Sequence, residues 1–193
     1  MPWQKQFDET VVLDRAMQAF WARGYEATSM QDLVDCTGIN RGSLYATYGG
    51  KHALFLAALR MYDQGMRREL TADLESRYRP REAVRRLFLA FTSQATEGGG
   101  NRGCFMTNTA LELAAHDAKA RRIVGRAQED IEVFFARMVE KGKATGEIPA
   151  RVDTATTARG LLASLLGLLV LIRSRPDAAL LQDVVDDAIR RLG

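Results

Sequence analysis

Residues 28–55, TSMQDLVDCTGINRGSLYATYGGKHALF, hold two short helical patterns that meet at Gly38. A glycine between two short helices is typical of the tight turn of a helix-turn-helix. The second pattern begins with Asn40-Arg41-Gly42-Ser43, which are small residues or donors able to bond nucleic acid. The stretch therefore predicts a DNA-binding helix-turn-helix.

Capping signals give the expected bounds of these two helices. Thr28, followed three residues later by Gln31, matches a capping box, so Thr28 is expected to begin the first helix. Asn40 is a favourable N-cap for the second helix, which Gly49 and Gly50 end. Both helices need apolar partners to bury their inner faces.

Those partners are helices on either side, one from about Asp8 to Gly24 and one that begins at Lys51. Three short helices predict an N-terminal domain over residues 1–52, with a connector helix over about 51–76. The apolar residues at helical spacing are Val12, Leu13, Ala16, Met17 and Phe20, then Leu54, Phe55, Ala58, Leu59 and Tyr62.

The remaining chain shows longer helical patterns and no strand alternation. Helices are expected over about 80–96 and 103–114, then a long helix stopped by Gly146 and Pro149, and two more over 153–174 and 176–192. The fold is therefore expected to be all-α with about nine helices, residues 53–193 forming a second domain.

The last two helices predict a homodimer. Residues 161–172 are apolar nearly all round, and few helices remain in the monomer to cover such a helix. A symmetric interface through about 153–192 would cover it. The alternative is a helix central to its own monomer.

Charge and composition limit the function classes. The net charge of +3 permits nucleic-acid binding, but among the first 60 residues six Lys and Arg side chains balance six Asp and Glu. DNA binding must therefore come from where the charges lie. The start lacks the apolar run of a secretory signal, and residues 160–172 are shorter than the roughly 20 needed to span a bilayer, so a cytoplasmic protein is expected.

Residues able to do chemistry are few. Cys36 and Cys104 do not form a disulfide framework or a metal site with His52 and His116, so no metal or cofactor is expected. No Ser-His-Asp set is evident, and the glycines at 98–100 lack the strand context of a nucleotide site. An enzyme is therefore a distant alternative. Cys36, a small residue of the first helix of the expected helix-turn-helix, is expected to be a packing residue.

Within the N-terminal 60 residues a dense set of positions forms one pattern: Phe20, Gly24, Tyr25, Thr28, Ser29, Met30, Asp32, Leu33, Gly38, Asn40, Arg41, Gly42, Ser43, Leu44, Tyr45, Tyr48, Lys51, Leu54 and Phe55. With these residues the segment resembles the TetR family of bacterial transcriptional regulators. Departures from the family pattern are Thr47-Tyr48 at the end of the second helix and the Gly49-Gly50 pair.

This resemblance implies a repressor that binds a palindromic operator as a homodimer. A small-molecule or reactive-electrophile signal in the C-terminal helical body would release it. Arg41 is expected to reach a guanine edge or a phosphate, and Gly42 to let the backbone approach the sugar-phosphate chain. The expected DNA-binding residues are Thr28, Ser29, Asn40, Arg41, Gly42, Ser43, Tyr45, Thr47 and Lys51.

Nine residues of the C-terminal domain, most of them aromatic or methionine, are candidates to line a ligand cavity, although plain core is the alternative for each of them. The candidates are Phe88, Phe91, Cys104, Met106, Asn108, Glu112, Phe134, Phe135 and Met138.

Cys104 lies in residues 101–113, NRGCFMTNTALEL, which resemble a segment of one TetR subgroup that has a cysteine here. Some members of that subgroup respond to electrophiles or oxidants. A helix N-terminus and the neighbouring Arg102 would increase the thiolate fraction of Cys104. Two interpretations stay open, a reactive sensor or a small buried residue that allows tight packing.

Two further questions stay open at this point. A non-specific or architectural DNA-binding protein would show no operator preference, whereas a regulator should bind its operator more tightly than other DNA. The sequence also does not separate a repressor from an activator.

Overall fold

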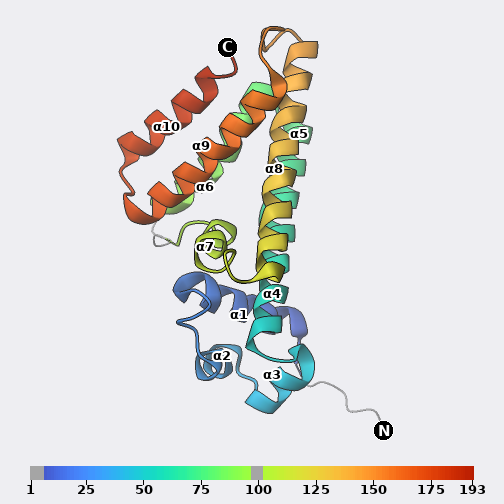
Figure 1. The fold of residues 1–193 in the computed structure, drawn as a ribbon, viewed down its shortest axis with the longest axis vertical. Helices are drawn as coiled ribbons and strands as arrows, with labels where there is room; N and C mark the ends of the chain where they lie inside the picture. Colours follow the sequence, from blue (N-terminus) through green and yellow to red (C-terminus); the bar gives the residue numbers. More distant parts are fainter. Residues whose placement is uncertain (1–6, 97–101) are drawn as a thin grey trace.

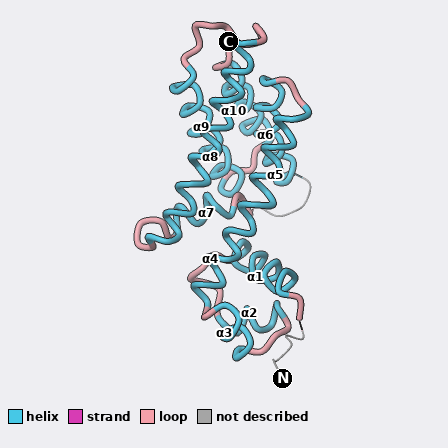
Figure 2. The backbone as a smooth tube through the Cα atoms, turned by 90° about the vertical axis from the view of Figure 1, so that its right-hand side faces the viewer, coloured by secondary structure: helices cyan, strands magenta, loops and turns pink. Residues whose placement is uncertain are grey.

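The computed structural model describes residues 7–96 and 102–193, and all regular structure in them is helical (Figures 1 and 2). Three helices, α1 (Glu9–Arg23), α2 (Met30–Thr37) and α3 (Arg41–Tyr48), form a compact unit at one end of the elongated molecule. We call this unit the head.

One continuous helix leads out of the head. It comprises α4 (Lys51–Tyr62), a π-helical turn η1 (Asp63–Arg68) and α5 (Glu69–Arg77). The remaining helices form the body, in which α7 lies next to the head (Figure 1). They are α6 (Pro80–Thr96), α7 (Phe105–Glu112), α8 (Ala118–Ala144), α9 (Thr154–Ser174) and α10 (Ala178–Arg190).

The observed helices confirm the predicted fold class. When Lys51–Arg77 is counted as one helix, the two described ranges contain nine helices and no strand. The predicted boundary at residue 52 falls in the first turn of α4. The glycines at 98–100 lie outside the described residues.

Most helix ends follow the local signals in the sequence. Asp8 and Asn40 cap α1 and α3 with their side chains, and Gly24, Gly38 and Gly49 end the three head helices with φ values of 87°, 75° and 82°. A positive φ costs glycine little, which explains why these helices end there.

The start of α2 differs from the prediction. Ser29, not Thr28, is the N-cap, and Asp32, not Gln31, completes the capping box. Thr28 is instead fully buried, and its hydroxyl donates to the carbonyl of Gly24 over 2.6 Å. The two adjacent hydroxyl residues offered equivalent local signals, and the buried position of Thr28 decided between them.

Aromatic side chains join the head to the body in one continuous core. The Phe55 ring meets Phe20 and Phe105 edge-to-face, with centroids 5.1 and 5.5 Å apart. Phe105 in turn meets Tyr62 at 5.7 Å. Phe55 of α4 therefore links Phe20 of α1 to Phe105 of α7.

Helix α9 is longer than its apolar run suggested. Its 21 residues make it long and apolar enough to cross a membrane by length and composition, with 33% of the most apolar window buried inside the chain. The same composition suits a core helix, and α9 packs along α8. The expectation drawn from residues 160–172 alone therefore underestimated this helix.

Candidate nucleic-acid interface

Helix α3 lies at the end of the head farthest from the body (Figure 1). Leu44 is buried and Tyr48 is half-buried, which holds one face of the helix against the head. The Tyr48 hydroxyl also donates to the Glu9 carbonyl over 3.1 Å. The opposite face, with Arg41 and Tyr45, is exposed to solvent.

Arg41 and Tyr45 lie together on that exposed face. The Arg41 guanidinium carbon is 5.7 Å from the centroid of the Tyr45 ring, which is 44% exposed. A cation held near an aromatic face remains free to donate hydrogen bonds from its edge. This pair presents donors of the kind that phosphates and guanine edges accept.

Asn40 and Gly42 serve the start of α3. The Asn40 side-chain oxygen accepts a hydrogen bond from the Ser43 backbone N–H over 2.8 Å. A β-carbon at Gly42 would lie 3.3 Å from that same oxygen, so the absent side chain gives the cap room. The predicted roles of Asn40 and Gly42 toward DNA are compatible with these local roles.

The start of α2 is a second exposed N-terminus of the head. The Ser29 hydroxyl and backbone N–H bond the Asp32 carboxylate over 2.7 and 2.8 Å, and Arg23 reaches the same carboxylate over 2.5 Å. The hydrogen bonds from Ser29 lower the pKa of Asp32 to about 2, with Arg23 adding to the effect. Ser29 is exposed and lies where helix N–H groups favour a phosphate, whereas Thr28 is turned into the core.

Lys51 opens α4 beside the head. Its Nζ lies 4.3 Å from the Tyr25 ring centroid and donates to the Glu26 carbonyl over 3.5 Å. Its charge is therefore held on the α1–α2 turn. Thr47, the remaining predicted contact, is half-buried near the end of α3.

In the body, a small apolar cavity of about 50 Å³ lies beside Cys104. Three predicted ligand residues, Phe91, Cys104 and Met106, line it. The other lining residues, which the sequence analysis did not select, come from α4, η1, α7, α8 and α9: Tyr62, Arg67, Thr107, Ala127, Gln128, Ile131, Leu162, Leu165, Leu166 and Leu169.

The other predicted ligand residues lie elsewhere. Phe88, Phe134, Phe135 and Met138 are fully buried in the core around α6 and α8. Asn108 and Glu112 line an open hollow of about 570 Å³ between the head and α9, together with Gly24. The structure therefore does not bring the predicted set into a single cavity.

Cys104 is the N-cap residue of α7 and is 6% exposed. The Tyr62 hydroxyl donates to its Sγ over 3.6 Å, and burial raises the pKa of Tyr62 well above its usual value. Arg102, expected to influence the thiol, instead donates to Gln18 over 2.9 Å and lies near the Trp21 ring. That expectation was wrong because contacts with α1 draw the guanidinium toward the head.

Comparison with known proteins agrees with this geometry. Residues 12–58 match the family model described as bacterial regulatory proteins, tetR family, and residues 80–187 match the tetracyclin repressor-like C-terminal domain. The chain belongs to the TetR family. The match covers both the head and most of the body, so this TetR-family chain is a transcriptional regulator and not an enzyme.

Curated relatives of this TetR-family chain are also regulators. It is 35% identical to the uncharacterized HTH-type transcriptional regulator YezE of Bacillus subtilis, over 94% of both chains. It is 29% identical to the HTH-type transcriptional repressor ComR of Escherichia coli, over 96% of this chain and 89% of the relative.

A solved structure resembles the whole TetR-family chain. A cysteine-substituted variant of the regulator CifR, complexed with a 26-base-pair double-strand operator DNA, matches with a TM-score of 0.85 and 29% identity. The match covers 97% of this chain and 98% of that one. DNA binding is thus supported by a structural relative solved on operator DNA.

Proposed function

We propose that this regulator is a repressor that binds a palindromic operator as a homodimer and is released by a signal received in the body. The exposed Arg41–Tyr45 face of α3 is the observation that carries the proposal, because it leaves donors free at the far end of the head. Relatives named repressors, ComR and DhaR, support the direction of regulation.

The proposed DNA contacts divide by role. Arg41 reads a base edge or a phosphate, and Tyr45 and Thr47 contact the backbone beside it. Lys51 flanks the inserted helix as a phosphate donor, and the exposed N-terminus of α2, capped by Ser29, adds its partial positive charge. Asn40, Gly42 and Ser43 set the start of α3, and buried Thr28 supports the turn without reaching DNA.

The proposed dimer forms through α9 and α10. One side of α9 is buried against the body, while Ala163, Gly167 and Val170 are exposed on another. Val170, in the C-terminal part of this long apolar helix, is 40% exposed. A Val170→Glu variant should be monomeric by light scattering and should bind operator weakly. A native protein that is itself monomeric at micromolar concentration would contradict the proposed dimer.

The proposed domain division assigns DNA binding to residues 1–52 and signal reception to 53–193. A cavity of about 50 Å³ holds only a few atoms, so it suits a small electrophile better than a bulky drug-like molecule. Cys104 is the reacting group in this proposal, and its segment resembles the one that carries a cysteine in one TetR subgroup. Binding to chromosomal DNA places the protein in the cytoplasm.

Selection of duplexes from a random pool tests the DNA-binding proposal. The native protein should enrich one palindromic sequence, and Arg41→Ala should bind it at least about tenfold more weakly while staying folded and dimeric. Arg60→Ala, an exposed arginine of α4 away from α3, is the matched control. Enrichment of no sequence would favour an architectural DNA-binding protein instead.

The proposed sensor needs its own experiment. Small aldehydes, quinones or hypochlorite should release the selected operator from native protein, and Cys104→Ser should remain bound. Cys36→Ser should respond like the native protein, since Cys36 belongs to α2 of the head and does not line the cavity. Equal release of native protein and Cys104→Ser would leave Cys104 as a packing residue.

A further inference from the structure

A carboxylate of the body binds the backbone of the head. Glu112, the last residue of α7, accepts a hydrogen bond from the Tyr25 N–H over 3.1 Å and one from the Glu26 N–H over 2.9 Å. The two bonds use different carboxylate oxygens, Oε2 for Tyr25 and Oε1 for Glu26. One side chain therefore occupies two successive donors of the α1–α2 turn.

These donors lie just beyond the end of α1, where the chain leaves the helix at Gly24. Successive backbone N–H groups in a turn form a small concave anion site, and a carboxylate satisfies both at once. Among the described residues, no backbone acceptor bonds the N–H of Tyr25 or of Glu26. Glu112 thus takes the place that water or a further helical turn would otherwise fill.

Gly24 makes room for this contact. A β-carbon there would lie 2.9 Å from Glu112 Oε2 and 3.1 Å from Oε1, so the carboxylate would have to shift away from the turn. Gly24 therefore has two reasons to be glycine, its φ of 87° and the carboxylate against it. The absent side chain lets the body reach the backbone of the head.

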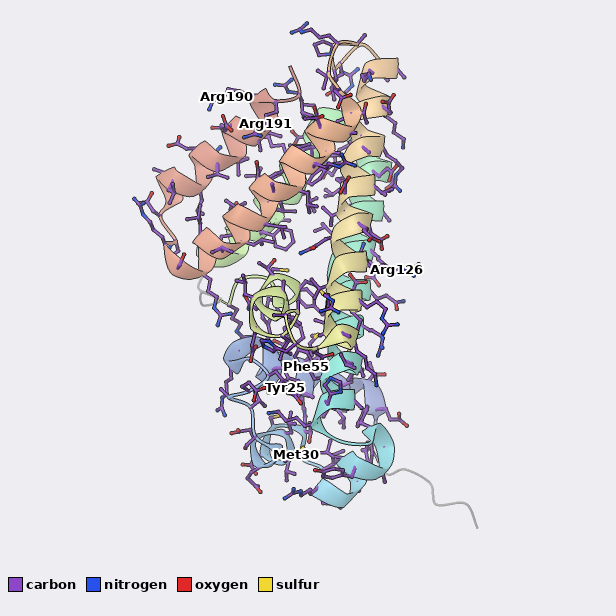
Figure 3. All side chains as sticks on the ribbon, viewed as in Figure 1. Tyr25, Met30, Phe55, Arg126, Arg190 and Arg191 are labelled. Carbon is purple, nitrogen blue, oxygen red and sulfur yellow. The ribbon has the colours of Figure 1, made fainter. Side chains whose placement is uncertain are left out.

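The bonded turn leads directly into the DNA-reading helices. Thr28 closes the turn by donating to the Gly24 carbonyl, and Ser29 next to it caps α2. The Tyr25 ring packs on Phe55 with centroids 5.0 Å apart, and both lie at the border between head and body (Figure 3). A shift of Glu112 would therefore move the whole start of α2.

We propose that Glu112 is a positioning residue for DNA reading, which fixes the orientation of α2 and α3 relative to the body. It contacts no DNA itself. Because both heads of a dimer must meet their half-sites together, an error in the orientation of each head lowers the affinity for the full operator. This proposal rests on the proposed function, since it assumes two heads on one palindromic site.

Other contacts tie the same parts together without replacing this one. Trp21 Nε1 donates to the Gly103 carbonyl over 3.0 Å, and His52 lies 2.5 Å from an oxygen of Asp117. These hold α1 to the segment before α7, and α4 to the segment after it. The α1–α2 turn itself is bonded by Glu112.

The test compares a full palindromic operator with a duplex that carries one half-site, using the whole protein at low salt. Glu112→Ala should bind the full operator about tenfold more weakly, the effect of losing a charge-assisted bond, and the half-site as tightly as native protein. Glu112→Gln, which keeps an acceptor oxygen, should bind the full operator with an affinity between those of the native protein and Glu112→Ala. Leu111→Ala, adjacent and 73% exposed in the native chain, should leave both affinities unchanged.

Two outcomes would overturn the proposal. Equal loss on the full operator and the half-site would mean that the head itself is damaged, and no loss on either would mean that Glu112 does not position it. Amide exchange at Tyr25 and Glu26 should quicken in Glu112→Ala. Failure of Arg41→Ala to weaken the half-site would overturn the proposed function instead, so the two failures are distinguishable.

Discussion

Ile148 packs so closely on Gly142 that a β-carbon at position 142 would lie 2.5 Å from Ile148 Cδ1. Ile148, 1% exposed, folds back on the last turn of α8, and its N–H donates to the Gly142 carbonyl over 3.0 Å. Gly142→Ala should therefore destabilise the protein by about 1–3 kcal/mol through overpacking. Thermal unfolding would measure the loss.

A matched glycine and a double variant test the cause. Gly125→Ala, in the same helix but with nothing within 4 Å of the added carbon, should be neutral or stabilising by up to about 1 kcal/mol. In an Ile148→Ala background, Gly142→Ala should lose most of its cost, because the competing side chain is gone. A cost that persists in this background would refute the overpacking explanation.

Two tyrosines three residues apart should separate DNA affinity from stability. Tyr45→Ala removes an exposed ring beside Arg41, so operator affinity should fall while the unfolding temperature stays unchanged. Tyr48→Ala removes a half-buried ring and the bond to the Glu9 carbonyl, and should cost about 2 kcal/mol of stability. The reverse pattern in binding assays and calorimetry would mean that α3 presents the opposite face to DNA.

Arg67 balances two carboxylates at the π-helical turn. It bonds Asp63 and reaches Asp130 over 2.9 Å, and the side chains of Arg67 and Asp63 are 11% and 13% exposed. Arg67→Met leaves both carboxylates without this cation and should cost about 2 kcal/mol in urea unfolding. Adding Asp63→Asn should recover part of that loss, whereas additive losses would show that the pair is not coupled.

The capping box of α2 predicts a pH dependence. The folded pKa of Asp32, about 2, lies below the ordinary carboxyl value, so its ionised form adds stability at neutral pH that is lost as the pH falls toward 2. Asp32→Asn should therefore be less stable than native protein near pH 7, and the gap should narrow below about pH 4. Thermal unfolding of both proteins from pH 7 to pH 2.5 measures this difference in stability. A difference that does not change with pH would exclude Asp32 ionisation as its source.

Local chemistry made much of the head predictable. The helix ends in the head lie at the residues that the sequence predicted, which are Gly24, Gly38, Asn40 and Gly49. Caps and positive φ values depend on only a few neighbouring residues. The exception is Thr28, whose role as a buried turn residue depends on packing with the rest of the head. A pattern of residue types does not report such burial.

The body was predictable in outline only. Glu112 does line a hollow, but its carboxylate also bonds a residue 87 positions earlier in the chain, a contact that the sequence analysis did not predict. Arg102 was expected beside Cys104 but bonds Gln18, 84 positions away. Both long-range contacts arise where α7 and the segment before it meet the head, and helical periodicity reports which face of a helix is apolar but not which helix it meets.

The π-helical turn in the connector adds a different kind of constraint, one of phase. Each residue advances a helix by about 100° of rotation, so a single deletion within residues 63–68 would turn everything beyond it by that angle. The faces of α4 that pack on α1 and of α5 that pack on α6 would then no longer be buried together. The number of residues between the two domains, as much as their identity, thus sets the side of the body on which the head is mounted.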